Sequence, residues 1–320
     1  MKKILLATTA LVISAAAANA QAVRIGGEGR MGLIWNRVTS ATAPTSTSWT
    51  MENRLQFNFA VSVEADHGLS FGAFTRARMQ MGGMGIGGYT ANQSAPFSGS
   101  RVWVEANNLR LTFGNQDGAF RGAGTAYGYL GGCAIGYVGG ILCGDTAGLL
   151  GRTQGFNSTG AAQGQKARLD YSFGDTRAAL SYVRGGSTEL GIRSTFDAIT
   201  VALGYSNRAT AAGAVGNTIA LSAHYNGGTW GVGALVAQLT NGRGAMRTRT
   251  TNWSVSGNVE VGGGNLAAYV GRVNNGIPNV SNNTWGLHYG YGLGGGATIS
   301  AGIERAARTT SAAVGVAFNF

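Results

Sequence analysis

The sequence predicts an all-β protein, a transmembrane antiparallel β-barrel of sixteen strands, from three observations. Glycine accounts for 55 of the 320 residues and charged residues for only 12%, whereas soluble domains average about 25% charged residues and about 7% glycine. Apolar and polar residues alternate with a period of two through most of the chain, which is the period of a β-strand. The N-terminus has the pattern of an export signal, which predicts that the chain leaves the cytoplasm.

Residues 1–20 are predicted to be a cleaved signal peptide, which leaves 21–320 as the barrel. Lys2 and Lys3 form a positively charged start, an apolar run follows, and Ala18-Asn19-Ala20 matches an A-x-A cleavage site. A transmembrane anchor is the alternative, but the apolar run is too short and ends in small residues. Beyond Ala20 no run of 18 apolar residues occurs, so we expect no membrane-spanning helix.

The first five predicted strands show the alternation most clearly. Each places apolar side chains on one face and polar or charged side chains on the other. Short turns are predicted at Asp66-His67-Gly68 and at Asn107-Asn108, because Gly and Asn favour tight turns. The five segments are 23–35, 51–63, 69–79, 101–105 and 109–113.

Eleven further strands are predicted after a long stretch without alternation. Residues 187–196 alternate weakly and are accepted as a strand because Asp197-Ala198 would then form a tight turn, and because the strand count would otherwise be odd. Glycine turns at 227–228, 262–264 and 294–296 separate later strands. The eleven segments are 166–173, 178–182, 187–196, 199–205, 219–225, 230–236, 253–259, 266–270, 285–291, 299–303 and 314–320.

A barrel fits these strands better than a β-sandwich, which would also alternate. Sixteen strands in residues 21–320 give about 19 residues per strand and connection, enough for a tilted membrane strand of about 10 residues. A sandwich of this size would normally divide into two domains, and no Pro-rich or Ser-rich linker is visible. An apolar outer face in lipid requires every backbone group to be paired, and therefore a closed sheet.

Aromatic residues near the predicted strand ends fit the two interfacial girdles of a membrane barrel. The alternative interpretation is a soluble secreted all-β protein, in which these aromatic residues would pack in the hydrophobic core. The aromatic residues in question are Trp35, Trp49, Tyr205, Trp230, Trp285, Tyr291 and Phe320.

Three segments carry a resemblance to a known family. They are the opening 23–32 (VRIGGEGRMG), the hairpin 194–205 (STFDAITVALGY) and the ending 314–320 (VGVAFNF). Together they resemble the general diffusion porins of Gram-negative outer membranes, of the α-proteobacterial type. The resemblance extends from Gln21 to Phe320, and the terminal aromatic residue is similar to the one that the outer-membrane insertion machinery reads in these porins.

The resemblance implies a water-filled channel for passive diffusion of small hydrophilic solutes and ions. It also implies a homotrimer in the outer membrane, in contact with its lipid bilayer and lipopolysaccharide, and a long third loop, here about 115–164, folded into each lumen. This loop differs from the usual acidic one. It holds only Asp117 and Asp145 as acids, together with Arg121 and Arg152, and it is rich in Gly and Ala.

Cys133 and Cys143 both fall in this loop and predict a disulfide. An even cysteine count in an exported chain favours a bridge, and closing so short a loop would contribute about 2–3 kcal/mol by the chain-entropy estimate. A zinc site is the weaker alternative, since no His or further Cys lies nearby in the sequence. The bridge would stiffen the segment that narrows the pore.

Seven arginines on the polar parity of the first five strands predict a cationic patch on the lumen wall. On the lipid face each would cost about 2–4 kcal/mol at the midplane, so they are expected to point inward. This wall holds more arginines than acids, which predicts a mild anion preference. The patch consists of Arg24, Arg30, Arg54, Arg76, Arg78, Arg101 and Arg110, with Glu28, Glu52 and Glu105 on the same wall and Asp117 and Asp145 on the loop.

Other functions receive less support from the sequence. The arginines could serve only to pair with the acids and hold the wall rigid. A substrate-specific channel is the second reading, but it would show aromatic residues along the lumen parity. A barrel enzyme is weaker, because His67, His224 and His288 show no catalytic spacing. No cofactor or metal site is expected, and nucleic-acid binding is disfavoured because the basic residues are spread over many strands.

Overall fold

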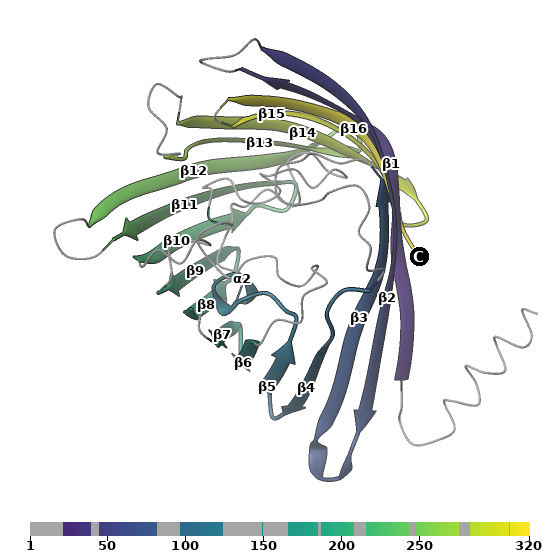
Figure 1. The fold of residues 1–320 in the computed structure, drawn as a ribbon, viewed down its shortest axis with the longest axis vertical. Helices are drawn as coiled ribbons and strands as arrows, with labels where there is room; N and C mark the ends of the chain where they lie inside the picture. Colours follow the sequence, from purple (N-terminus) through teal and green to yellow (C-terminus); the bar gives the residue numbers. More distant parts are fainter. Residues whose placement is uncertain are drawn as a thin grey trace, which may run out of the picture.

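The computed structural model describes residues 22–39, 45–81, 97–123, 149, 166–184, 187–207, 216–242, 247–274, 282–306 and 308–320. The strands of this part of the chain form one closed antiparallel barrel of sixteen strands (Figure 1). Residues 1–20 and the side chains of Cys133, Cys143 and Asp145 lie outside the described residues.

The strands run in sequence order around the barrel. The first eight are β1 (Ala22–Val38), β2 (Ser46–Glu64), β3 (Ser70–Met81), β4 (Arg101–Ala106), β5 (Leu109–Gly114), β6 (Lys166–Phe173), β7 (Thr176–Val183) and β8 (Thr188–Phe196). The second eight are β9 (Ile199–Ser206), β10 (Gly216–Asn226), β11 (Trp230–Asn241), β12 (Thr248–Val261), β13 (Gly264–Arg272), β14 (Asn283–Gly294), β15 (Ala297–Ala306) and β16 (Thr309–Asn319). The expected fold class and strand number are confirmed, and so is the weak strand, which is β8.

The barrel closes between its first and last strands. β1 pairs with β2 on one side and with β16 on the other, so neither strand presents a free edge. The seam extends to the C-terminus, where the Gly27 amide donates to the Phe320 carbonyl over 2.8 Å and the Phe320 amide donates to the Gly27 carbonyl over 3.1 Å. The last residue therefore takes part in the sheet.

Tight turns join the strands at one end of the barrel. Asn107 and Asn108 have φ values of 49° and 65°, and Gly262 and Gly263 have values of 59° and 77°. Two successive residues with positive φ make the type I′ turn that matches the twist of a hairpin. A short 3-10 helix, η1 (Asp66–Gly68), joins β2 to β3 at the same end. The opposite end holds the longer connections, including the one that follows Gly114. We refer to these as the turn end and the loop end.

The outer face of the barrel is apolar and exposed. Met51 is 79% exposed, Trp49 72% and Ile25 65%, whereas such side chains in a soluble protein would be buried. A surface of this extent is stable only against an apolar surrounding. The only helix among the described residues besides η1 is α2 (Ala119–Gly122). No described helix is long and apolar enough to cross a bilayer.

Candidate pore lining and its loop

The position of α2 identifies the inner face of every strand. α2 lies within the ring of strands (Figure 1), and its backbone is bound by Ser181 of β7 and Glu189 of β8. Ser181 and Glu189 are opposite one another in the β7–β8 register. Because side chains alternate along a strand, the register transfers this inward parity from strand to strand around the whole barrel.

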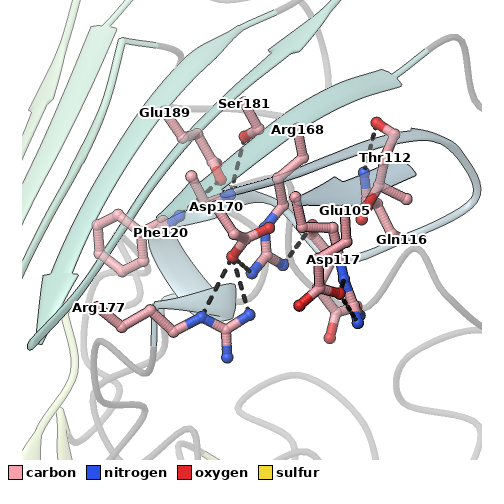
Figure 2. Close-up of polar contacts among 12 residues, drawn as sticks. Glu105, Thr112, Gln116, Asp117, Phe120, Arg168, Asp170, Arg177, Ser181 and Glu189 are labelled. Carbon is pink, nitrogen blue, oxygen red and sulfur yellow. Dashed lines mark hydrogen bonds and ion pairs between the residues drawn. The ribbon is translucent and has the colours of Figure 1, made fainter. Parts of the chain in front are cut away.

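Side chains of the wall cap the first turn of α2. The Ala119 amide donates to Ser181 Oγ over 2.8 Å, and the Phe120 amide donates to Glu189 Oε2 over 3.2 Å (Figure 2). Ser181 and Glu189 are almost completely buried. The first amides of a helix have no partner within it, and leaving a buried amide unpaired costs about 1–3 kcal/mol. The wall therefore fixes where the helix begins.

The segment before α2 is bound by basic side chains of β6. Lys166 Nζ donates to the Gln116 carbonyl over 2.6 Å, and Arg168 Nη1 donates to the Asp117 carbonyl over 3.3 Å. The Gln116 side chain returns to β5 by donating to the Thr112 carbonyl over 3.1 Å. The loop thus follows the wall for the eight residues from the end of β5 to the end of α2.

A carboxylate shared by two arginines supports this contact. Asp170 of β6 is buried and accepts hydrogen bonds from Arg168 and, over 2.8 Å, from Arg177 Nη2 of β7 (Figure 2). The pairing holds the Arg168 guanidinium where its other nitrogen reaches the Asp117 carbonyl. Charge-assisted bonds of this kind are about twice as strong as neutral ones.

An apolar patch on the inner wall receives the remainder of the described loop. Phe120 of α2 packs with Leu149, which belongs to the same loop, and with inward side chains of β10 and β11. Leu235 and Leu239 lie on the inner parity of β11, whereas Val236 lies on the outer parity. β11 is therefore apolar on both faces. The patch consists of Phe120, Leu149, Ala220, Leu235, Ala237 and Leu239. A lumen wall would otherwise be polar, so these leucines mark where the loop lies.

All ten strand residues predicted for the lumen wall have inward parity in the barrel. Three ion pairs form among them. Arg30 Nη2 lies 2.6 Å from Glu52 Oε1 across β1 and β2, and Arg54 Nη1 lies 2.9 Å from Glu28 Oε1 across the same two strands. On β4 and β5, Arg110 Nε donates to Glu105 Oε2 over 2.6 Å.

Neutral groups hold other arginines of this wall. Arg78 Nε donates to Gln56 Oε1 over 2.7 Å. The Phe74 ring, also inward, lies between two guanidinium groups, with Arg101 Cζ at 4.1 Å from its centroid and Arg76 Cζ at 5.3 Å. Cation–π contacts and amide bonds orient a guanidinium without neutralising its charge. Arg24 lies on the inner parity near the turn end of β1 and is exposed.

Asp117 interacts with its own loop and with the charged wall. Its carboxylate lies 3.4 Å from Arg121 Nε, four residues later in the same loop, and it interacts electrostatically with Arg101 of β4. Asp145, Cys133 and Cys143 lie in the undescribed part of the loop. Among the described residues, no three His, Cys, Asp or Glu side chains gather as a metal site would require.

Sequence reasoning missed the side chains that hold the loop. Lys166, Arg168 and Asp170 show the correct polar parity in the sequence, but nothing there links them to residues some 50 positions earlier. Leu235 and Leu239 carry a usable signal, since a strand with apolar residues on both parities needs an apolar contact on each face. Inward Phe74, Trp103 and Tyr269 are also exceptions to the expectation that aromatics lie mostly outside.

The inner face is divided into a half with many charged side chains and a half with few. The described inner face of β9–β16 has two acids, Glu260 and Glu304, and neither Arg nor Lys. That of β1–β8 has eleven basic and six acidic side chains. The eleven are Arg24, Arg30, Arg54, Arg76, Arg78, Arg101, Arg110, Lys166, Arg168, Arg177 and Arg193, and the six are Glu28, Glu52, Glu64, Glu105, Asp170 and Glu189.

Comparisons with known proteins agree with this architecture. A variant of the Rhodopseudomonas blastica porin superposes with a TM-score of 0.73 at 21% identity, covering 93% of this chain and 100% of that one. A second variant of that porin gives a TM-score of 0.72 at 21% identity with the same coverage. At this identity the likeness shows the fold alone. No curated protein matches the sequence.

The sequence itself gives the assignment. The model of a family described as Gram-negative porin matches residues 7–311, which is most of the chain, and the sixteen-stranded barrel is the one that the superposed porins share. This is a channel architecture rather than that of an enzyme. The chain belongs to the Gram-negative porin family and is a multi-pass β-barrel of the outer membrane that works as a diffusion channel.

Proposed function

We propose that this channel passes small hydrophilic solutes and ions through a water-filled lumen with a mild preference for anions. The observation behind the proposal is the charge of the inner face. Eleven basic side chains stand against eight acidic ones over all sixteen strands, and all of the basic ones lie on β1–β8. Rings and patches of Arg and Lys favour anions in a pore. The excess is small, so the preference is expected to be weak.

Reversal potentials in a planar bilayer test this proposal. With the purified protein inserted between two KCl solutions of different concentration, we expect a reversal potential of the sign that chloride permeability gives. The potential should shrink as both salt concentrations rise, because the Debye length falls from about 30 Å at 0.01 M to about 3 Å at 1 M. Clear cation selectivity at low salt would refute the anion preference, and an electrically silent bilayer would refute the channel.

We further propose that residues 1–20 are removed as a signal peptide and that the mature chains form a homotrimer in contact with lipid and lipopolysaccharide. The family membership and the exposed apolar outer face support the second part. Cross-linking of the detergent-purified protein should yield a trimer as the largest product, and N-terminal sequencing should begin at Gln21. A monomer at all protein concentrations would contradict the trimer.

The predicted bridge between Cys133 and Cys143 stays part of the proposal. It would tie the loop beyond α2, at a point that lies outside the described residues. Reducing the folded protein is expected to increase the current noise of the open channel, because a stiffened loop would become free to move. The measurement pairs single-channel recording with thiol alkylation and mass spectrometry. Complete alkylation of both cysteines without reductant would contradict the bridge.

A further inference from the structure

Trp103 of β4 is an aromatic side chain on the inner face of the barrel, among the arginines of the wall. It is the register partner of Gly72 of β3. A Cβ built on Gly72 would overlap the indole, so the ring covers the backbone where a side chain of β3 would otherwise stand. Trp103 is half-buried, and the exposed part of its ring therefore faces the lumen.

Arg101 of β4 lies two residues before Trp103 and has the same inward parity. Two rises of a strand separate their Cα atoms by about 7 Å. The Arg101 guanidinium lies over the Phe74 ring, with Cζ 4.1 Å from the ring centroid. A guanidinium that covers a ring with its face keeps the N–H donors at its edge. Among the described groups none accepts a hydrogen bond from Arg101, and none of its nitrogens is fully buried. These donors are therefore available to a solute in the lumen.

The acids of this part of the wall already bind other arginines. Asp117 interacts electrostatically with Arg101, but its carboxylate lies 3.4 Å from Arg121 Nε. Glu105 accepts a hydrogen bond over 2.6 Å from Arg110 Nε. The Arg110 side chain is 45% exposed, and its Cζ lies over the indole at 5.3 Å from the ring centroid. The neighbourhood of the indole is therefore cationic and open to the lumen.

We propose that Trp103 and Arg101 form a binding site for planar aromatic carboxylates on the lumen wall. The inference rests on the proposed function in that it takes the lumen to be water-filled and open to solutes. The ring of such a solute would pack against the indole, since aromatic pairs attract beyond their buried area. Its carboxylate would accept the two parallel hydrogen bonds that a guanidinium fork offers. Because Phe74 already orients Arg101, binding costs little side-chain freedom. A saturated acid would make only the second contact and a neutral aromatic solute only the first.

Isothermal titration calorimetry of the purified full-length protein in detergent tests this proposal with three probes. Naphthoate has both the planar ring and the carboxylate, its decahydro analogue keeps the carboxylate on a saturated ring system, and naphthamide keeps the ring without the charge. Titrations into micelles without protein correct for partitioning into detergent. We expect the Kd of naphthoate to be about fivefold below that of either analogue, because an aromatic pair contributes a factor of about two to ten.

Substitutions at the two positions separate the role of the ring from that of the charge. Trp103→Leu should weaken naphthoate binding about fivefold and remove its advantage over the decahydro analogue, whereas Trp103→Phe keeps a ring and should retain most of both. Arg101→Gln should weaken the binding of the two acids alike, by about tenfold, because charge-assisted hydrogen bonds are lost. Tyr269→Leu is the matched control. Tyr269 also covers an inner-wall glycine, Gly286, but it is 2% exposed and lies in β9–β16, whose described inner face has neither Arg nor Lys.

Conduction gives a second measurement and separates this inference from the proposed function. In a planar bilayer, naphthoate should lower the KCl conductance to a plateau, with its half-effect near the Kd, because an occupied site narrows the lumen. Equal affinities of naphthoate and the decahydro analogue for the wild type, or equal effects of Trp103→Leu and Tyr269→Leu, would overturn the site even if the channel conducts as proposed. Trp103-dependent binding with an electrically silent bilayer would instead support the site and refute the channel proposal alone.

Discussion

Gly191 of β8 shows how one residue sets the distance between the loop and the wall. A Cβ built on Gly191 would overlap the carbonyl oxygen of Ala119, the first residue of α2. Because the helix is only four residues long, no other part of it can compensate for a displaced start. A glycine at this position is therefore required for the contact of α2 with Ser181 and Glu189.

Changing Gly191 to Ala is expected to push α2 away from the wall and to break one or both amide hydrogen bonds at its start. Each lost bond leaves a buried amide unpaired and costs about 1–3 kcal/mol. The thermal midpoint of the detergent-solubilised barrel should fall, and single-channel noise should rise. Gly292→Ala is the matched control, since it changes another inward strand glycine at which an added Cβ would meet no other atom within 4 Å. Equal effects of the two substitutions would contradict this account.

The sequence predicts single residues well only where parity decides their place. Every arginine assigned to the lumen from its alternation has inward parity. The partners of Lys166, Ser181 and Glu189 could not be predicted, because these partners lie in the loop after β5. The loop sequence has no periodicity from which the direction of its groups could be inferred. The partner of Asp117 was unpredictable for the same reason, since a pair four residues apart needs the chain to turn there.

The pair of β1 and β16 is the element on which the closed sheet depends. Outward Phe318 and Phe320 of the C-terminal segment lie over the backbone of Gly29 and Gly27, where a Cβ would overlap their rings. Phe320 also meets Phe57 of β2 edge to face, with ring centroids 5.6 Å apart. The two rings therefore cover the backbone of the seam on its outer face.

Substituting Gly29 with Val should hinder closure of the barrel, because the Phe318 ring would lose its place beside the seam. We expect a lower yield of folded protein in detergent, measured as the fraction that shows faster gel migration before heating. Met31→Val, at the next outward position of the same strand, is the matched control, since Met31 lies opposite Val316 rather than beneath a ring. An unchanged folded fraction for Gly29→Val would contradict the role of the ring contact.

The elements themselves were largely predictable. All sixteen strands were expected, because alternation is a local property of the sequence and because tight turns need Asn or Gly at fixed places. Even the weak β8 was expected, from its turn at Asp197-Ala198. The short α2 was not, since four residues are too few to show a helical period. Strand ends also shifted outward, as in β12, which begins at Thr248 although the alternation is visible only from Trp253.

Over the whole molecule, the charged side chains of the lumen form two groups with different roles. Those of β6–β8 bind the loop, as Lys166, Arg168 and Glu189 show. Those of β1–β3 are held by wall groups such as Glu28, Gln56 and Phe74 and keep a net positive charge. The ion selectivity of the channel should therefore depend on the charges of β1–β3 more than on those of β6–β8.

Replacing Arg54, Arg76 and Arg78 together by Gln should abolish the anion preference or reverse it. β1–β3 would then carry two inward cations, Arg24 and Arg30, against the three inward acids Glu28, Glu52 and Glu64. Reversal potentials at low salt provide the measurement. The variant with Lys at the same three positions is the control and should keep the wild-type sign, since it keeps the charge. A Gln variant that is still as anion-selective as the wild type would show that selectivity is set elsewhere in the lumen.

The seam between the first and the last strand has a bearing on incomplete copies of the chain. A ribosome product that stops before β16 leaves β1 without its second neighbour and Gly27 without the terminal carbonyl that it binds. Such a fragment is an open ribbon, which lipid does not tolerate, and it encloses nothing. A truncated copy is therefore not expected to form a leak in the membrane, because closure of the ring requires the last strand.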